Sequence, residues 1–350
     1  MKALAIILML LTFSFGVNAQ IESKRVENTD EPCYEKARKI RAAAKGWQCG
    51  KMPNVIDCGE ELEFSEDSGM FTKKAKSTAD LSGVGKPFTG ACESCFYSNG
   101  GLERRIYFLN GKEHGQDTTY YENGCVQVIR SHMQGAEHGT WTFYYDSTQN
   151  IAWEMNYQVG EKHGKQVYIK KNGDTTKLEH YAAGKLEGVK KDYYKGNLLY
   201  KEVNYKAGVL HGKFQLYNRD GVLIEDANYN MSKKHGVQKM YYDDGVLLRT
   251  ENYENGVKHG EFKMFYYQGF VQSLEVYNKG LKVGRWEDFY HDQRLKRVQV
   301  YDNKGVLIEE HQFDEHGNET YTFGGKTMSE KEDDDLMKAE AKGKKKKKKK

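Results

Sequence analysis

A glycine recurs at an almost constant interval through most of this chain of 350 residues. The series runs in steps of 24 residues with a single step of 25: Gly115, Gly139, Gly164, Gly188, Gly212, Gly236, Gly260 and Gly284. Self-similarity at such a period is the signature of a repeat protein, in which each unit is too small to fold alone and is stabilised by its neighbours. We therefore expect a stack of similar units, with a degenerate first copy near Gly90.

Two further positions of each unit are almost always aromatic. Five residues after the glycine stand Tyr120, Tyr144, Ile169, Tyr193, Tyr217, Tyr241, Phe265 and Phe289. Seven residues before it stand Phe108, His132, Tyr157, Tyr181, Tyr205, Tyr229, Tyr253 and Tyr277, and Tyr301 continues this row. Burial of one such ring contributes about 1.5–3 kcal/mol. We therefore expect each copy to pack its rings against the next copy.

The stretches between the glycines are typical of β-strands. Each unit has two short runs rich in Tyr, Phe, Val and Leu, and turn sequences such as Asp243-Asp244-Gly245 separate them. Glycine at two or three places in every unit leaves no room for a long helix. The sequence predicts a mainly β protein: an elongated antiparallel single-sheet solenoid of stacked β-hairpins, with a small N-terminal helical cap that contains cysteines.

The string from Tyr253 to Gly260, with Phe262 and Phe265 after it, resembles the MORN repeat variant of the bacterial YwqK-type antitoxin-like family. The resemblance covers about residues 86–317, two thirds of the chain. It implies a non-enzymatic scaffold, because MORN units are linked to protein binding, to membrane attachment in some eukaryotic members, and to toxin neutralisation in the YwqK-type module. An exported chain would not reach a cytoplasmic toxin.

The repeats depart from this pattern at single positions. No turn glycine is found near Thr148, and Ser232 replaces a return glycine. Glu187 and Val283 stand where other copies have histidine. These departures concern individual turns, so the expected fold is unchanged.

Histidine precedes the repeat glycine in six copies: His114, His138, His163, His211, His235 and His259. Equivalent positions in successive hairpins lie about 9–10 Å apart, two strand spacings. Histidine ligands must lie about 2.0–2.1 Å from one metal ion, so neighbours in this row do not share one easily. We expect each imidazole to bond a turn or to pack on a tyrosine. The sequence predicts no catalytic site, no metal site and no cofactor, and we interpret the protein as not an enzyme.

Adjacent tyrosines such as Tyr144-Tyr145 and Tyr193-Tyr194 place rings on both faces of a sheet, because side chains alternate along a strand. Two interpretations are open: the second face binds a partner, or a curved sheet packs these rings within itself.

The ends of the chain predict further segments. Residues 1–19 have the form of a secretory signal peptide, with Lys2, an apolar run and a small residue at the cleavage site. We expect a cysteine-containing cap at 20–64 with a helix from about Pro32, a linker at 65–85, the repeats at 86–328 and a disordered acidic and polylysine tail at 329–350.

Export favours disulfides between the six cysteines. The candidates are Cys33, Cys49, Cys58, Cys92, Cys95 and Cys125, and the sequence does not choose among fifteen pairings.

The charge and hydropathy of the chain limit the classes of partner that we expect. The formal net charge of +4 includes the seven lysines of 344–350, so the rest of the chain carries −3 and no basic domain for nucleic acid. No transmembrane span is expected after signal cleavage. We expect an exported protein of the periplasm, outer envelope or medium that binds another macromolecule, most readily a protein. The alternative is an envelope glycan- or lipid-binding module that uses the tyrosine rows and the lysine tail.

Overall fold

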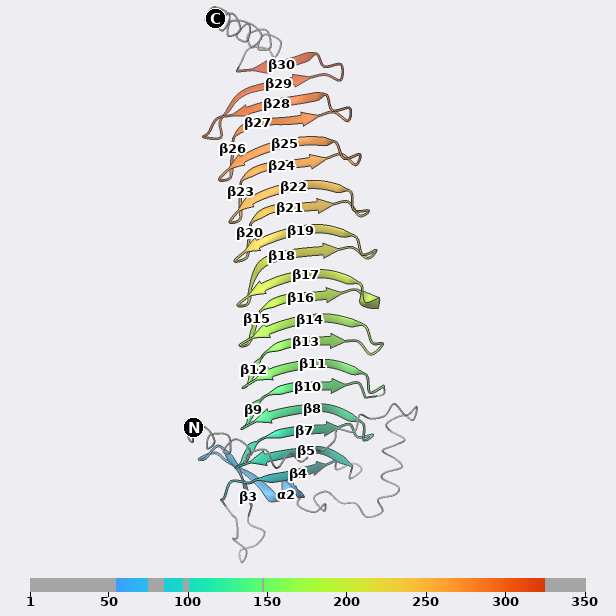
Figure 1. Cartoon of the computed structure of the whole chain (residues 1–350), viewed down its shortest axis with the longest axis vertical. Helices are drawn as coiled ribbons and strands as arrows, with labels where there is room; N and C mark the ends of the chain where they lie inside the picture. Colours follow the sequence, from blue (N-terminus) through green and yellow to red (C-terminus); the bar gives the residue numbers. More distant parts are fainter. Residues whose placement is uncertain (1–54, 75–84, 97–100, 147, 325–350) are drawn as a thin grey trace, which may run out of the picture.

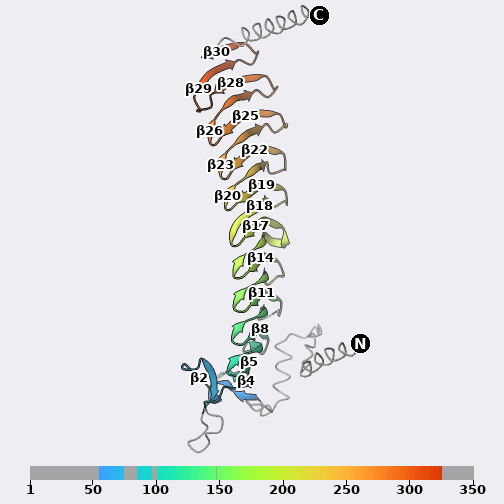
Figure 2. The same ribbon diagram turned by 60° about the vertical axis from the view of Figure 1, so that its left-hand side comes forward.

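The computed structural model describes residues 55–74, 85–96, 101–146 and 148–324. In this part of the chain one sheet of 28 strands runs the length of the molecule, and a two-stranded sheet lies at its N-terminal end. Figure 1 shows the strands stacked as a single column with turns along both sides, and Figure 2 shows the same column turned by 60°. The predicted elongated sheet of stacked β-hairpins is confirmed.

Each repeat contains a long strand, a tight turn, a two-residue strand and a strand that begins at the repeat glycine. The long strands are β5 (Leu102–Leu109), β8 (Val126–Met133), β11 (Ile151–Gln158), β14 (Thr175–Ala182), β17 (Leu199–Lys206), β19 (Leu223–Asn230), β22 (Leu247–Glu254), β25 (Val271–Asn278), β28 (Leu295–Tyr301) and β29 (Leu307–Phe313). The two-residue strands are β6 (Lys112–Glu113), β9 (Ala136–Glu137), β12 (Glu161–Lys162), β15 (Lys185–Leu186), β20 (Lys233–Lys234), β23 (Val257–Lys258) and β26 (Leu281–Lys282).

The remaining strands of the repeats begin at or near a glycine. They are β4 (Gly90–Cys95), β7 (Gly115–Tyr120), β10 (Gly139–Tyr144), β13 (Gly164–Ile169), β16 (Gly188–Tyr193), β18 (Val209–Tyr217), β21 (Gly236–Tyr241), β24 (Gly260–Phe265), β27 (Gly284–Phe289) and the last strand, β30 (Glu319–Phe323). A short 3₁₀ turn, η1 (Lys195–Asn197), lies between β16 and β17.

Hydrogen bonds join every copy to both neighbours. Strand β22 pairs with β21 on one side and with β23 and β24 on the other, and β24 then pairs with β25. All the pairings between repeats are antiparallel, and the register repeats from copy to copy. No repeat within the described residues therefore stands alone, as the solenoid prediction requires.

The glycines are needed where the backbone turns. In the turn before β23, Asn255 and Gly256 have φ values of 51° and 88°, the left-handed pair that matches the twist of a two-residue hairpin. The repeat glycine Gly260 also has a positive φ, of 82°, where β23 gives way to β24. Ser232 replaces the return glycine and keeps a positive φ of 64°, so this departure from the repeat pattern leaves the turn in place.

The N-terminal end of the sheet is closed by a small unit made of β1 (Val55–Asp57), α2 (Cys58–Glu61), β2 (Leu62–Ser65) and β3 (Met70–Lys73). Strand β1 pairs with β4 in parallel, and a disulfide joins Cys58 to Cys92 of β4. The ring of Phe71 packs 4.9 Å from that of Phe108. The predicted linker at 65–85 is therefore wrong for β3, whose apolar residues pair with β2 and cover the first repeat.

Several predictions fall outside the described residues. These are the signal peptide, the cap helix from about Pro32, Cys33 and Cys49, and the tail at 329–350. Within the described part, Cys95 and Cys125 are also disulfide-bonded.

Candidate functional site

The two positions that recur most regularly in the repeat, glycine and tyrosine, face each other across neighbouring strands. Gly236 lies opposite Tyr253, and Gly260 lies opposite Tyr277. The same register joins Gly139 to Tyr157, Gly164 to Tyr181, Gly188 to Tyr205, Gly212 to Tyr229 and Gly284 to Tyr301. A glycine in a strand has no side chain to pack, so an aromatic ring from the opposite strand stabilises the pair.

The rings continue along one face of the sheet as an aromatic ladder, which we define as Tyr253, Phe262, Tyr277, Trp286 and Tyr301. Successive ring centroids lie 5.4, 4.9, 5.0 and 5.1 Å apart, within the range of favourable aromatic pairs. Phe262, Trp286 and Tyr277 are at most 9% exposed. The ladder is a core one layer deep, built on the face of a single sheet.

Lysines from the two-residue strands cover the rings of this ladder. The Nζ atom of Lys258 lies 4.8 Å from the ring centre of Phe262 and 4.5 Å from that of Tyr277, and it donates to the Tyr277 hydroxyl at 3.3 Å. Lys282 lies 4.3 Å from the ring of Trp286 and 5.2 Å from that of Tyr301. Such cation–π contacts leave the ammonium group in water while the side-chain stem shields the ring.

The hydroxyl groups of the tyrosines opposite the glycines are bonded within the protein. Tyr253 donates to Glu251 at 3.0 Å, and Tyr277 donates to Glu275 at 3.0 Å. Burial, the hydrogen bond and the negative charge of Glu251 raise the pKa of Tyr253 to about 12. Burial and Glu179 raise the pKa of Tyr181 to about 12 in the same way.

The tyrosines six residues after the repeat glycine tie each copy to the next. Tyr266 donates its hydroxyl proton to the main-chain carbonyl of Phe289 at 2.7 Å, and Tyr290 donates to that of Phe313 at 2.8 Å. The same bond is made by Tyr121, Tyr145 and Tyr194. This row of tyrosines therefore packs within the sheet, which was one of the two interpretations open from the sequence.

Sequence reasoning missed the position two residues after the repeat glycine. At this position Trp141, Gln166, Gln238 and Trp286 each donate a side-chain N–H to a main-chain carbonyl ten residues earlier, at 2.9–3.3 Å. Tryptophan and glutamine are interchangeable here because both carry an N–H at the required reach. The signal in the sequence was the recurrence of N–H-bearing residues at this position, which hydrophobicity alone does not detect.

In two of the six copies, the histidine before the repeat glycine bonds the neighbouring turn. The Nδ1 atoms of His114 and His235 accept from the backbone N–H groups of Gln134 and Asn255, both at 3.4 Å. Glu187, which replaces histidine, accepts from the equivalent N–H of Ala207 at 2.7 Å. The predicted turn-bonding role is confirmed for His114 and His235. In the described residues, no three His, Cys, Asp or Glu side chains come together as metal ligands.

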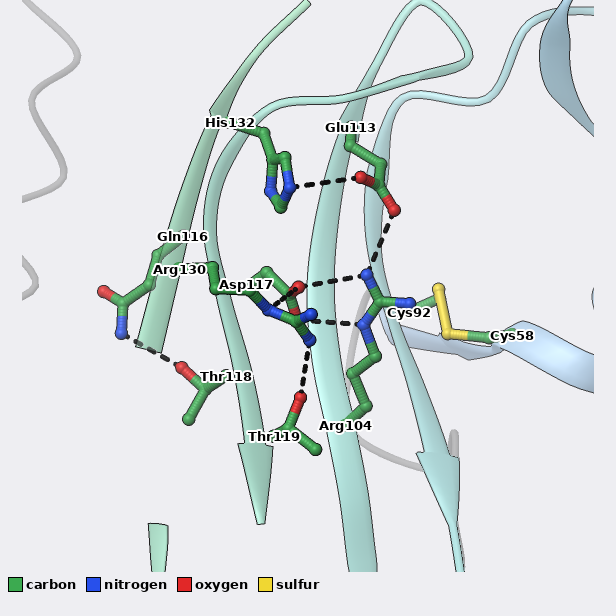
Figure 3. Close-up of polar contacts among 10 residues, drawn as sticks. All are labelled: Cys58, Cys92, Arg104, Glu113, Gln116, Asp117, Thr118, Thr119, Arg130 and His132. Atoms are coloured by element: carbon green, nitrogen blue, oxygen red, sulfur yellow. Dashed lines mark hydrogen bonds and ion pairs between the residues drawn. A yellow bond between two sulfur atoms is a disulfide. The ribbon is translucent and has the colours of Figure 1, made fainter. Parts of the chain in front are cut away.

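An ionic cluster replaces the aromatic ladder in the first repeats. Figure 3 shows the buried carboxylate of Asp117 between Arg104 and Arg130. Arg104 donates to Asp117 at 2.9 and 3.0 Å, and Arg130 Nε lies 3.0 Å from the same carboxylate. Glu113 contacts Arg104 at 3.0 Å and His132 at 3.4 Å. The charges of two carboxylates and two guanidinium groups balance, as a buried charge requires.

The residues of this cluster occupy the same repeat positions as the ladder. Asp117 corresponds to Phe262, and His132 corresponds to Tyr277, by their distances from the repeat glycine. Glu113 stands where Lys258 stands in its copy. One backbone register thus supports either a stack of rings or a compensated ion cluster. Both sets join neighbouring strands of the sheet through their side chains.

Comparison with known proteins agrees with the geometry of the repeat. Two adjacent repeats match the MORN repeat variant family. The matched residues are 210–231 and 234–255. The resemblance to YwqK-type antitoxin-like proteins stays a prediction. No curated protein matches the chain in a sequence comparison.

Solved structures give only distant similarities. A crystal structure of TcdB2-TccC3 is 10% identical, with 72% of this chain and 16% of that chain covered and a TM-score of 0.18. The TcdB2-TccC3-Cdc42 structure is 11% identical over 72% of this chain and 18% of that chain, with a TM-score of 0.16. The Photorhabdus luminescens Tc holotoxin pore is 12% identical over 74% and 16%, with a TM-score of 0.16. Scores this low do not relate the folds.

Proposed function

We propose that the protein is an exported, non-enzymatic repeat scaffold that binds another macromolecule, most readily a protein, through its extended sheet. The observation that carries this proposal is the single-layer sheet. Beyond the first repeats, no other described element packs on it, so its surface is continuous from β8 to β30. A long, regular surface of this kind is the usual binding platform of solenoid proteins.

The face opposite the aromatic ladder favours a protein partner. Positive and negative side chains form ion pairs along this face: Lys191 with Glu202 at 3.0 Å and Lys263 with Glu261 at 2.6 Å. Exposed apolar residues such as Val237, 48% exposed, lie on the same face. Mixed charge with scattered apolar side chains matches the composition of protein interfaces, whereas a polyanion would favour a basic surface.

Export is supported by the chemistry of the cysteines. Cys58 and Cys92 form a disulfide, and Cys95 and Cys125 are also oxidised. Disulfides of this kind persist in the periplasm, at the cell surface or in the medium. None of the helices in the described part of the chain has the length and apolar character needed to cross a bilayer.

The alternative is an envelope glycan- or lipid-binding module that uses the tyrosine rows. The internal bonds of Tyr253, Tyr266 and Tyr277 weigh against it, because rings packed at both faces and hydroxyls already bonded offer little to a sugar. The lysine tail at 344–350 supports only the lipid branch of this alternative.

Capture from a native envelope extract tests both functions. The full-length chain is immobilised, and bound material is identified from untreated extract and from extract digested with protease. A protein partner is expected to disappear after digestion. Retention of carbohydrate or of anionic vesicles after digestion would instead favour the alternative, and loss of vesicle binding on deletion of 329–350 would assign it to the tail. Substrate turnover by the isolated chain would contradict the non-enzymatic part of the proposal.

A further inference from the structure

The last hairpin carries an excess of negative charge. Residues 307–324, which contain β29 and β30, include five carboxylates and no lysine or arginine. The carboxylates belong to Glu309, Glu310, Asp314, Glu315 and Glu319. The preceding hairpin, residues 283–306, has four acidic and five basic residues. The last hairpin is therefore more acidic than the hairpin that precedes it.

Part of this charge is used within the hairpin. The fully buried His311 contacts Glu309 at 2.7 Å and also Glu319, and this arrangement joins β29 to β30. Glu310 accepts from Gln299 at 3.0 Å. Glu315, in the turn between the strands, is exposed. The terminal hairpin thus has a fixed internal structure and still carries an excess of negative charge.

Exposed aromatic residues lie on the same hairpin. Tyr321 and Phe323 of β30 are 48% and 47% exposed. Phe323 lies opposite Glu310, which in turn lies opposite Gln299 two residues before Tyr301. Side chains two residues apart share a face, so Phe323 continues the face of the aromatic ladder beyond its last ring. Rings that would be covered by another copy in mid-sheet are half open here.

Within the described residues, the sheet ends at the outer side of β30. Among the described residues β30 pairs only with β29, and Figure 1 shows it as the outermost strand. At the opposite end, β4 is paired with β1 and tied to α2 by the Cys58–Cys92 disulfide. An unpaired edge strand offers a row of backbone donors and acceptors to another strand, and β30 has none of the lysines or prolines that protect such edges.

We infer that the outer edge of β30 is the docking site for an extended, basic segment of a protein partner, which adds as a strand with lysine or arginine toward the carboxylates and apolar side chains against Tyr321 and Phe323. This deepens the proposed function and rests on it. A second copy of the chain fits poorly, because edge-to-edge contact would bring together two hairpins with five carboxylates each. The charge of the hairpin therefore selects the partner.

A short peptide of alternating lysine and valine is the probe, and a peptide of alternating glutamate and valine is the control. Binding to the full-length chain is followed by fluorescence anisotropy, and backbone amide exchange locates the site. The basic peptide is expected to slow exchange within 319–323, and its affinity is expected to fall as salt rises. Equal binding of the acidic peptide, or protection only in other strands, would overturn the inference.

Four variants separate the contributions. Glu315→Lys is expected to weaken binding of the basic peptide about fivefold at low salt, and Tyr321→Thr about tenfold. Glu161→Lys and Tyr267→Thr, at exposed positions away from β30, make the same chemical changes and should leave binding unchanged. If deletion of 344–350 increases the affinity for the peptide while the controls do not, the chain's own lysines occupy the edge and the inference of a partner fails.

The experiments distinguish failure of the docking site on β30 from failure of the proposed scaffold function. Capture of a protein partner that is undiminished by Glu315→Lys and Tyr321→Thr would refute the edge site and leave the scaffold function standing. Protection of 319–323 by the basic peptide, with no protein captured from the envelope, would refute the scaffold function instead.

Discussion

Replacement of Tyr277 by alanine is the sharpest test of the aromatic ladder. The side chain is 9% exposed, its ring lies 4.9 Å from that of Phe262 and 5.0 Å from that of Trp286, and it covers Gly260. Its hydroxyl bonds Glu275. Removal of a buried aromatic ring costs about 3–5 kcal/mol, and the ladder has no second layer that could collapse into the gap. We expect Tyr277→Ala to lower the free energy of unfolding by this amount.

A second variant divides this loss between ring and hydroxyl. Tyr277→Phe keeps the stacked ring and removes the donor to Glu275, so it should cost about 1.5–3 kcal/mol, the range for a hydrogen bond to a charged group. The control is Tyr267→Ala, at a tyrosine 56% exposed, which should change stability much less. Urea unfolding followed by circular dichroism gives the global values, and amide exchange in β24, β25 and β27 gives the local ones.

The result that would refute this reasoning is specific. If Tyr277→Ala and Tyr267→Ala shift the unfolding midpoint equally, burial in the ladder does not stabilise the repeats. If Tyr277→Phe is as costly as Tyr277→Ala, the hydroxyl dominates and the stacked rings contribute little.

Three further predictions concern the glycine, a phenol and the ionic cluster. Gly260→Ala should cost more than about 1 kcal/mol in urea unfolding, because φ is 82° and a Cβ would lie 2.7 Å from Asn252 Nδ2; Gly236→Ala, with open space around the Cβ, should cost less. The pKa of Tyr253 is raised to about 12, above the value of about 10 in the unfolded chain. The stabilisation that comes from this shift is therefore complete below about pH 10 and is lost as the pH rises through about 12. Urea unfolding at alkaline pH should show this loss of stability, and the Tyr253→Phe variant should not show it. Asp117→Asn should cost about 3 kcal/mol by thermal or urea unfolding, since two arginines lose their buried counter-charge, and an unchanged midpoint would contradict the ionic cluster.

Much of the fold could be predicted from the repeat. The constant spacing of glycine and tyrosine showed which residues of different copies are equivalent. The glycine-rich composition of each copy excluded long helices. The linker assigned to 65–85 was wrong for Met70–Lys73, because a short strand packed on one neighbouring hairpin has too few residues to show a period. The turn-bonding histidines were predicted, although not that Glu187 serves the same N–H.

Less of the candidate site could be predicted from the sequence. Sequence spacing does not show that the glycine of one copy lies opposite the tyrosine of the next, because register depends on pairing between strands. For the same reason, the contacts that Asp117 makes in place of Phe262, and the main-chain bond that tryptophan and glutamine both make at that position, appeared only in the structure. The open edge of β30 likewise depends on which strands pair.

The sequence by itself determined that this protein is an array of β-hairpins, because local preferences for turns and strands repeat with the period of the chain. Only the tertiary structure decided which side chains of different copies meet. It therefore decided which tyrosines bond the next copy, and which acidic hairpin lies at the end of the sheet among the described residues. The physical reason is that turns are set by residues adjacent in the chain, whereas ring stacking, ion pairing and an open edge arise between residues that pairing alone brings together.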